Sequence, residues 1–236
     1  MHARRAGVGA ASTALLALLV ACAQQPAAPA PSEFRLAYLA KTDIDMVADL
    51  HCQAAFADLQ ALALKLYRRN PREWRPSGAP SPETRTQRIF RRPYRWDHPE
   101  LGGRRGADAV LLAFDEGYRG DRVLAFVVGL ASMLEVAYNG KSEFFVFDGL
   151  DAQRLYNSAR NLEIAAWKLG HARRPDGQPY LVSNALDGPV TNLSYERLFG
   201  KLIAEQDMLA RIVAEKRNRA IKSVLQNLAT AAFLPM

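Results

Sequence analysis

Seven arginines stand within residues 85–105, and their type and spacing suggest chemistry more strongly than any other side chains do. Arginine presents a planar fork of N–H donors that matches the oxygens of phosphate and carboxylate groups. The segment holds only two acidic residues, and three aromatic residues are interleaved with the arginines. The pattern predicts an anion-binding surface, and the alternative is a solvated loop whose arginine stems cover apolar surface. The residues that we assign to this surface are Arg88, Arg91, Arg92 and Arg95.

A second polar group combines one carboxylate with three residues of a later segment. Glu135 closes the most apolar stretch of the chain, and Asn157, Arg160 and Asn161 follow on a segment that we expect to pack against it. A buried carboxylate needs a partner, and Arg160 is predicted to supply it. We therefore expect a structural network between two helices, with a ligand pocket as the alternative.

The sequence offers little for catalysis or metal binding. The three histidines beyond the first residues stand in separate segments, at no spacing typical of metal ligands. The sequence contains neither a G-x-S-x-G nor an S-x-x-K motif, and no phosphate-binding G-x-x-x-x-G-K loop. We expect a non-enzymatic protein without metal or cofactor, and an enzyme of another type is the alternative.

The first 21 residues have the composition of an export signal. Arg4 and Arg5 precede sixteen uncharged residues, 6–21, that are mostly apolar. As a helix these would cover roughly 24 Å, short of the ~30 Å hydrocarbon core of a bilayer. A cleaved leader over residues 1–21 fits better than a permanent span.

The end of this leader carries a motif. Residues 19–22, Leu-Val-Ala-Cys, resemble the lipobox of bacterial lipoproteins. The resemblance implies that Cys22 receives a diacylglycerol, that the chain is cut before it, and that the new amine is acylated. The alternative is an ordinary signal-peptidase site around Ala21-Cys22-Ala23. Two or three acyl chains would make a durable membrane anchor.

Residues 22–32 are rich in Pro and Ala and are expected to form a flexible tether. The Asp that retains enterobacterial lipoproteins at the inner membrane is absent after Cys22, so the resemblance implies the outer membrane, facing the periplasm. The segments NGKSEFF (139–145) and LYNSARNLEIAAWKL (155–169) resemble uncharacterised lipoproteins of Gram-negative bacteria. That resemblance implies a location in the cell envelope and no particular activity.

The second cysteine, Cys52, follows His51 directly. With Cys22 acylated, Cys52 would have no disulfide partner, and a small buried apolar residue is the interpretation that we favour. A nucleophile activated by His51 is the alternative. Adjacent helical residues point about 100° apart, which disfavours that activation.

The body, residues 33–236, is predicted to be a single all-α domain. We expect about five major helices, a Pro/Arg-rich ordered loop over 71–106 that contains a short helix at 82–90, and a long C-terminal helix. Apolar residues recur every three or four positions, as helices require. The major helices are predicted over 42–70, 107–118, 121–138, 151–170 and 194–228.

Removing the leader leaves 29 basic and 24 acidic residues, a net charge of +5. This mild excess permits anionic partners without requiring nucleic acid. We expect a membrane-anchored periplasmic lipoprotein that acts as an envelope interaction or assembly-support module, with an envelope protein or anionic lipid as partner and no nucleic acid. The alternative is a carrier of small ligands or lipids, with a pocket beside the apolar helix at 121–138.

Overall fold

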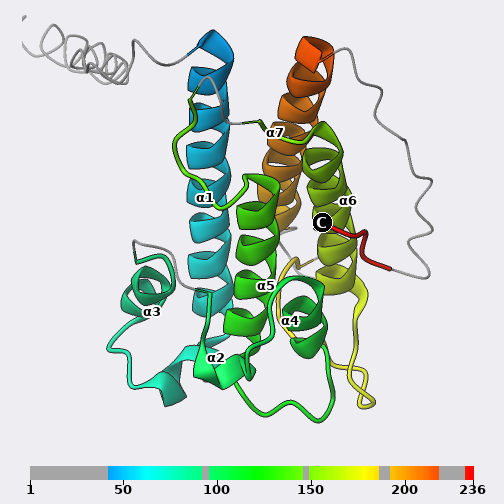
Figure 1. Cartoon of the computed structure of the whole chain (residues 1–236). Helices are drawn as coiled ribbons and strands as arrows, with labels where there is room; N and C mark the ends of the chain where they lie inside the picture. The colour runs from blue at the N-terminus through cyan, green and yellow to red at the C-terminus, as the bar shows by residue number, and fades with distance from the viewer. Residues whose placement is uncertain (1–41, 92–95, 146–148, 186–191, 218–231) are drawn as a thin grey trace, which may run out of the picture. The chain divides into compact units, whose positions relative to one another are not determined.

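The predicted all-α class is confirmed by a computed structural model, which describes residues 42–91, 96–145, 149–185, 192–217 and 232–236 (Figure 1). Within these ranges the chain is a single helical domain without a β-strand, and its only β pairing is two isolated bridges. The helices are α1 (Asp43–Arg69), α2 (Pro71–Trp74), α3 (Pro82–Ile89), α4 (Gly106–Leu112), α5 (Arg122–Ala137), α6 (Ala152–His171) and α7 (Ser194–Arg217). Two short 3₁₀ turns, η2 (Arg75–Ser77) and η3 (Pro99–Leu101), complete the described elements.

Side-chain caps fix the starts of four helices, close to where the sequence predicts them. Thr42 and Asp45 form a reciprocal capping box at the start of α1. Ser81, Asp121 and Asp151 accept backbone N–H groups at the starts of α3, α5 and α6. These bonds satisfy donors that the first helical turn leaves unpaired.

The ends of three helices differ from the prediction. α4 stops at Leu112 rather than near Tyr118, because the following carbonyl groups turn toward the side chain of Arg122 instead of continuing a helix. α6 continues through Gly170 to His171, so this glycine lies within the last turn. α7 is described to Arg217, and the predicted remainder up to Leu228 lies outside the described residues.

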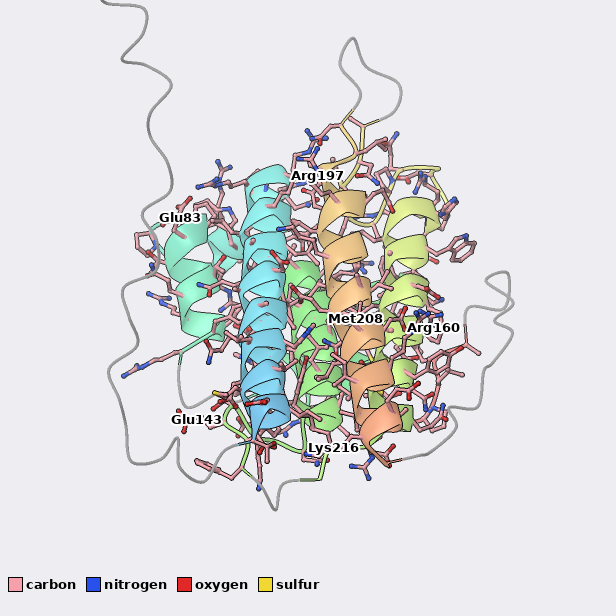
Figure 2. All side chains as sticks on the ribbon, turned by 90° about the horizontal axis from the view of Figure 1, so that it is seen from above. Glu83, Glu143, Arg160, Arg197, Met208 and Lys216 are labelled. Atoms are coloured by element: carbon pink, nitrogen blue, oxygen red, sulfur yellow. The ribbon has the colours of Figure 1, made fainter. Side chains whose placement is uncertain are left out.

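Helix α5 occupies the centre of the core. All of its residues except Glu135 and Val136 are buried. It packs against α1, α2, α4 and α6, while α7 packs against both α1 and α6. Figure 2 shows α3, α1, α7 and α6 side by side in that order, with α5 behind them. The predicted apolar helix over 121–138 is therefore a buried core helix.

Glycine at position 129 allows α4 to approach α5 closely. A Cβ there would lie 2.7 Å from both the carbonyl oxygen of Gly106 and the backbone nitrogen of Val110. Ser132, one turn later, accepts the Gly106 N–H at 2.8 Å and so fixes the start of α4. The position of α4 in turn fixes the loop from Ala113 to Gly120, which borders the candidate site below.

The Pro/Arg-rich segment 71–106 is anchored by aromatic packing. Trp96 is 1% exposed and stacks on Phe56 of α1 at 6.2 Å between ring centroids, with Phe90 against its edge at 6.0 Å. Trp74 packs against the core, and Tyr94 lies outside the described residues. The segment also contains α2, where the sequence predicts loop.

No helix of the described residues is long and apolar enough to cross a membrane. Cys22 and the rest of residues 1–41 lie outside them, so the leader, the anchor and the tether stay predictions.

Candidate anion-binding pocket

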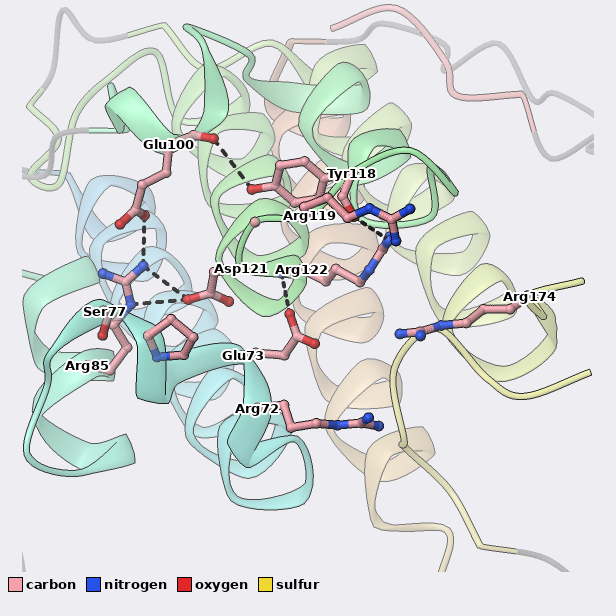
Figure 3. A pocket seen from close by; sticks show the side chains of 12 residues that line it. Arg72, Glu73, Ser77, Arg85, Glu100, Tyr118, Arg119, Asp121, Arg122 and Arg174 are labelled. Carbon is pink, nitrogen blue, oxygen red and sulfur yellow. Dashed lines mark hydrogen bonds and ion pairs between the residues drawn. The ribbon is translucent and has the colours of Figure 1, made fainter. Parts of the chain in front are cut away.

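A pocket of about 350 Å³ lies at the N-terminal end of α5, lined by side chains from well-separated parts of the chain (Figure 3). It combines α2, η2, α3, η3, the loop between α4 and α5, the first residue of α5 and the loop after α6. Charged residues dominate the lining. We call it the arginine pocket, and its lining residues are Arg72, Glu73, Pro76, Ser77, Arg85, Glu100, Tyr118, Arg119, Gly120, Asp121, Arg122 and Arg174.

A buried ion pair forms one wall of the arginine pocket. The Nη2 and Nε atoms of Arg85 donate to Oδ2 of Asp121 at 3.0 and 3.2 Å, and both side chains are less than a tenth exposed. Tyr67 donates its hydroxyl to the same oxygen at 2.8 Å, and Glu100 accepts a third Arg85 bond at 2.8 Å. Because each partner is satisfied, the pair is stable in the core. Removing either Arg85 or Asp121 would leave the other side chain buried with an unpaired charge.

Burial shapes the proton affinities in this wall. It raises the pKa of Asp121 to about 6, while the Leu124 N–H and the Arg85 guanidinium act in the lowering direction. Burial also raises the pKa of Tyr67 well above its ordinary value, and it raises the pKa of Tyr118 to about 12. At pH 7 both phenols therefore stay protonated, and Asp121 is mostly ionised.

Arg122 forms the floor of the arginine pocket. Its guanidinium donates to the carbonyl oxygens of Ala113, Asp115 and Tyr118 at 2.8, 2.8 and 2.6 Å, and lies 5.0 Å from the ring centroid of Tyr180. These bonds hold the loop between α4 and α5 against the start of α5. Arg122 therefore has a structural role, although it adds its charge to the pocket.

Glu73 lies beside this floor. Its Oε2 accepts the backbone N–H of Arg122 at 2.7 Å. Burial raises the pKa of Glu73, and the charges of Arg122, Arg174 and Arg72 act in the lowering direction. Figure 3 shows these three guanidinium groups gathered near the Glu73 carboxylate. The carboxylate is an internal counterion for part of the arginine cluster.

Three arginines of the lining remain available for a ligand. Among the described residues, Arg72, Arg119 and Arg174 make no ion pair with a carboxylate. Arg174 has only a long bond of 3.4 Å to the carbonyl of Tyr180, and its Nε is buried without a hydrogen-bond partner. Guanidinium groups in this state favour an incoming oxyanion, since it would supply the missing acceptors.

Among the described arginines of the run over 85–105, Arg85 alone lines this pocket. Arg88 and Arg91 are exposed and do not line the pocket, while Arg92 and Arg95 lie outside the described residues. Arg85, from the same run, is turned inward and ion-paired. Arg88 and Arg91 therefore face solvent, as an anion-binding surface requires. Their role in binding stays a prediction.

The predicted pairing of Glu135 with Arg160 is wrong. Arg160 donates to Asp207 of α7 at 2.6 Å and pairs with Glu163 at 3.0 Å. Asn161 is the next residue and points about 100° away around α6, so one face cannot present both residues to Glu135. Glu135 is half-buried and lies in a different pocket.

Asn157 and Asn161 instead hold the C-terminal residues. They lie one helical turn apart on α6, and their amide groups donate to the carbonyl oxygens of Pro235 and Leu234 at 2.8 and 3.0 Å. Three of the four residues in the predicted network therefore fall into two separate sets, and Glu135 is in neither. One set joins α6 to α7, and the other joins α6 to the chain end.

A second pocket, of about 530 Å³, lies beside α5 and the C-terminal residues. Its walls are mostly apolar, with Met133 and Val136 from α5 and Phe233, Leu234 and Met236 from the chain end. Arg105, Ser132 and Glu135 contribute polar groups. This pocket lies beside the helix at 121–138, where the carrier alternative expects one. Whether the pocket holds a ligand stays a prediction.

Cys52 is 1% exposed inside the core, which confirms the interpretation as a buried packing residue. Its Sγ lies 3.7 Å from the carbonyl oxygen of Lys141. Burial lowers the pKa of the neighbouring His51. Across the described residues, no group of three or more His, Cys, Asp or Glu side chains is placed to hold a metal ion.

Sequence patterns do not point to the residues that matter most in the arginine pocket. Arg72, Glu73, Arg119 and Arg174 are scattered over about a hundred positions and share no local pattern. One signal was present: the dipeptide Asp121-Arg122 opens the most apolar helix. An arginine at the edge of such a segment becomes buried and must find acceptors.

The fold and this site define an all-α domain with an arginine-lined pocket at the end of its central helix. No protein-family model matches the chain, and no curated protein or solved structure matches it.

Proposed function

We propose that this chain is a lipid-anchored, non-enzymatic module of the outer-membrane periplasmic face that recognises an anionic group of a lipid or partner protein. The observation that carries the proposal is the arginine pocket, in which five arginines from separate segments line one cavity. Three of them make no ion pair with a carboxylate of the described residues. Such a site binds an oxyanion by charge and by hydrogen-bond geometry.

The proposed location at the outer membrane rests on Cys22 and on the apolar leader before it. We expect the chain expressed in a Gram-negative host to incorporate labelled palmitate and to fractionate with the outer membrane. Cys22→Ser should abolish both, and Cys52→Ala serves as the control because it removes the buried thiol and keeps the anchor. A Cys22→Ser protein that remains membrane-bound, with a wild type that takes no label, would remove the lipid anchor from the proposal.

Anion recognition is tested with the mature chain, residues 22–236, made soluble by Cys22→Ser. We expect it to bind vesicles that contain anionic lipid, and to lose binding as salt rises, since charge contacts are screened within a Debye length of about 8 Å at physiological ionic strength. Two sets of substitutions show which arginines contact the vesicle.

Gln at Arg72, Arg119 and Arg174 removes the unpaired charges of the arginine pocket, and Gln at Arg88, Arg91, Arg92 and Arg95 removes those of the exposed run. Loss with the first set alone favours the pocket, and loss with the second alone favours the run.

A carrier of small apolar ligands or lipids is the second candidate function. The 530 Å³ pocket beside α5 favours it, because its size and its mostly apolar lining are typical of small-molecule sites. Organic extraction of the purified protein followed by mass spectrometry tests this candidate. A stoichiometric apolar compound would support it. Val136→Trp, which would fill the pocket, should then reduce the amount recovered.

A further inference from the structure

The charge balance of the arginine pocket narrows the kind of anion that it would accept. The lining holds five arginines against three carboxylates, which leaves a net charge of +2 when all are ionised. A singly charged anion would leave one positive charge uncompensated in a partly buried site. A doubly charged anion would neutralise the net charge of +2.

The arrangement of the arginines also favours a group with several acceptor oxygens. Arg85 and Arg122 are held by protein acceptors, so they provide a fixed charged wall and floor. Arg72, Arg119 and Arg174 reach the pocket from α2, the α4–α5 loop and the loop after α6. A tetrahedral phosphate presents oxygens in several directions and meets such a set better than a planar carboxylate does.

We propose that the arginine pocket binds a phosphomonoester, whose terminal phosphate carries a charge of about −1.5 to −2 at pH 7. This inference rests on the proposed anion recognition and names its ligand class. The guanidinium of Arg174, which lines the pocket and makes only a long bond of 3.4 Å to the Tyr180 carbonyl oxygen, donates to one phosphate oxygen. The volume of about 350 Å³ accommodates a phosphate with a short linker, which excludes a folded polymer as the inserted group.

Two sources carry this chemistry, and they differ in what is attached to the phosphate. One is a lipid head group that ends in a phosphomonoester, and the other is a soluble phosphorylated compound. Glycerol 3-phosphate serves as the soluble probe. Vesicles of phosphatidylcholine with phosphatidic acid serve as the lipid probe, and vesicles with phosphatidylglycerol, a phosphodiester of single charge, are the comparison at equal surface charge.

The test uses the mature chain with Cys22→Ser, by calorimetry for glycerol 3-phosphate and by co-sedimentation for the vesicles. The pocket variant carries Gln at Arg72, Arg119 and Arg174, and the control carries Gln at Arg69, Arg197 and Arg211, which are exposed and lie outside both the lining and the arginine run. Both lose three charges. We expect a tenfold or larger loss of phosphomonoester binding in the pocket variant and less than twofold in the control.

A Lys variant at the same three pocket positions separates charge from geometry. It keeps the charge and loses the guanidinium fork, so binding should fall between the other two. If the pocket variant fails to fold, Arg72→Gln and Arg119→Gln are made singly, since both side chains are exposed at the surface. Each alone should weaken binding at least threefold with an unchanged helical signal.

The outcomes distinguish the ligand class from the proposed function. Binding of glycerol 3-phosphate with no preference for phosphatidic acid supports a soluble ligand, and a preference for phosphatidic acid over phosphatidylglycerol supports a lipid ligand. Equal binding to both vesicles that survives in the pocket variant overturns the phosphomonoester inference, while anion recognition stands. Binding to none of the three probes overturns the inference and removes the support for anion recognition as well.

Discussion

Asn161 of α6 binds both backbone polar groups of Leu234. The Leu234 N–H donates to Oδ1 of Asn161 at 2.6 Å, and Nδ2 of Asn161 donates to the Leu234 carbonyl oxygen at 3.0 Å. Asn161 is fully buried beneath the chain end. A side-chain amide thus pairs with the backbone as a neighbouring strand would, and it holds the described end of the chain, residues 232–236, which lies outside any helix.

Replacing Asn161 by Ala should release the chain end. The two backbone groups of Leu234 would be left unpaired, at a cost of about 1–3 kcal/mol in the free energy of unfolding. Urea denaturation measures this cost, and hydrogen exchange at the Leu234 amide should become fast. In a chain lacking residues 233–236, Asn161→Ala should cost clearly less. An equal cost in both backgrounds would show that Asn161 acts elsewhere.

The ion pair of Arg85 with Asp121 should be essential for stability. Arg85→Ala strands a carboxylate that is 7% exposed, and we expect a loss of about 3 kcal/mol. Arg68→Ala is the matched control, because its pair with Glu83 is exposed, at 62% and 44% of the two side chains. That change should cost less than 1 kcal/mol. Similar losses in the two variants would contradict the buried pair.

Arg160 should couple to Asp207 and not to Glu135. A double-mutant cycle for Arg160→Ala and Asp207→Ala should give a coupling free energy of about 0.5–1 kcal/mol, since both side chains are partly exposed. The same cycle with Glu135→Ala should be additive. Coupling to Glu135 of equal size would restore the pairing that the sequence suggested.

Two glycines should respond to alanine in opposite directions. Gly129→Ala places a methyl group against the backbone of α4 and should cost about 1–3 kcal/mol. Gly170→Ala adds a methyl group in the last turn of α6 with no atom within 4 Å, so it should stabilise by about 0.5–1 kcal/mol. Thermal unfolding measures both. A neutral Gly129→Ala would show that α4 moves away readily.

Glu205 on α7 should make the stability depend on pH. Burial raises its pKa from the ordinary 4.5 to about 7, helped by repulsion from Asp58 and opposed by Lys201. Between these pH values the folded state binds more protons than the unfolded state. The contribution of Glu205 to the free energy of unfolding therefore falls as pH rises from 4.5 to 7.

Glu205→Gln removes this dependence. Because water screens a half-exposed carboxylate, the variant should gain roughly 1 kcal/mol over wild type at pH 8 and little at pH 4.5. His51, which faces Glu205 and whose pKa burial lowers, titrates with the opposite sign, so the difference between the two proteins is the quantity to compare. Glu215→Gln, an exposed change on α7, is the control. A constant difference across this range would contradict the raised pKa.

The starts of the helices follow from short stretches of sequence. Thr42, Ser81, Asp121 and Asp151 cap α1, α3, α5 and α6 close to the predicted helix starts, because a cap needs only a side chain and the next three residues. The burial of Cys52 and of the 121–138 segment likewise follows from apolar periodicity. The predictions that depended on which helix faces another were less successful, as Arg160 and Glu135 illustrate.

The sequence by itself determined the all-α class, most helix starts and the expectation of a lipid anchor at Cys22, since each of these depends on neighbouring residues. Only the tertiary structure decided the arginine pocket. Arg72, Arg85, Arg119, Arg122 and Arg174 meet because the packing of α2, α3, α4 and α6 around the start of α5 brings distant segments together. A local sequence pattern cannot predict this cluster. Whether each guanidinium finds a hydrogen-bond acceptor depends on side chains and carbonyl groups of other helices and loops.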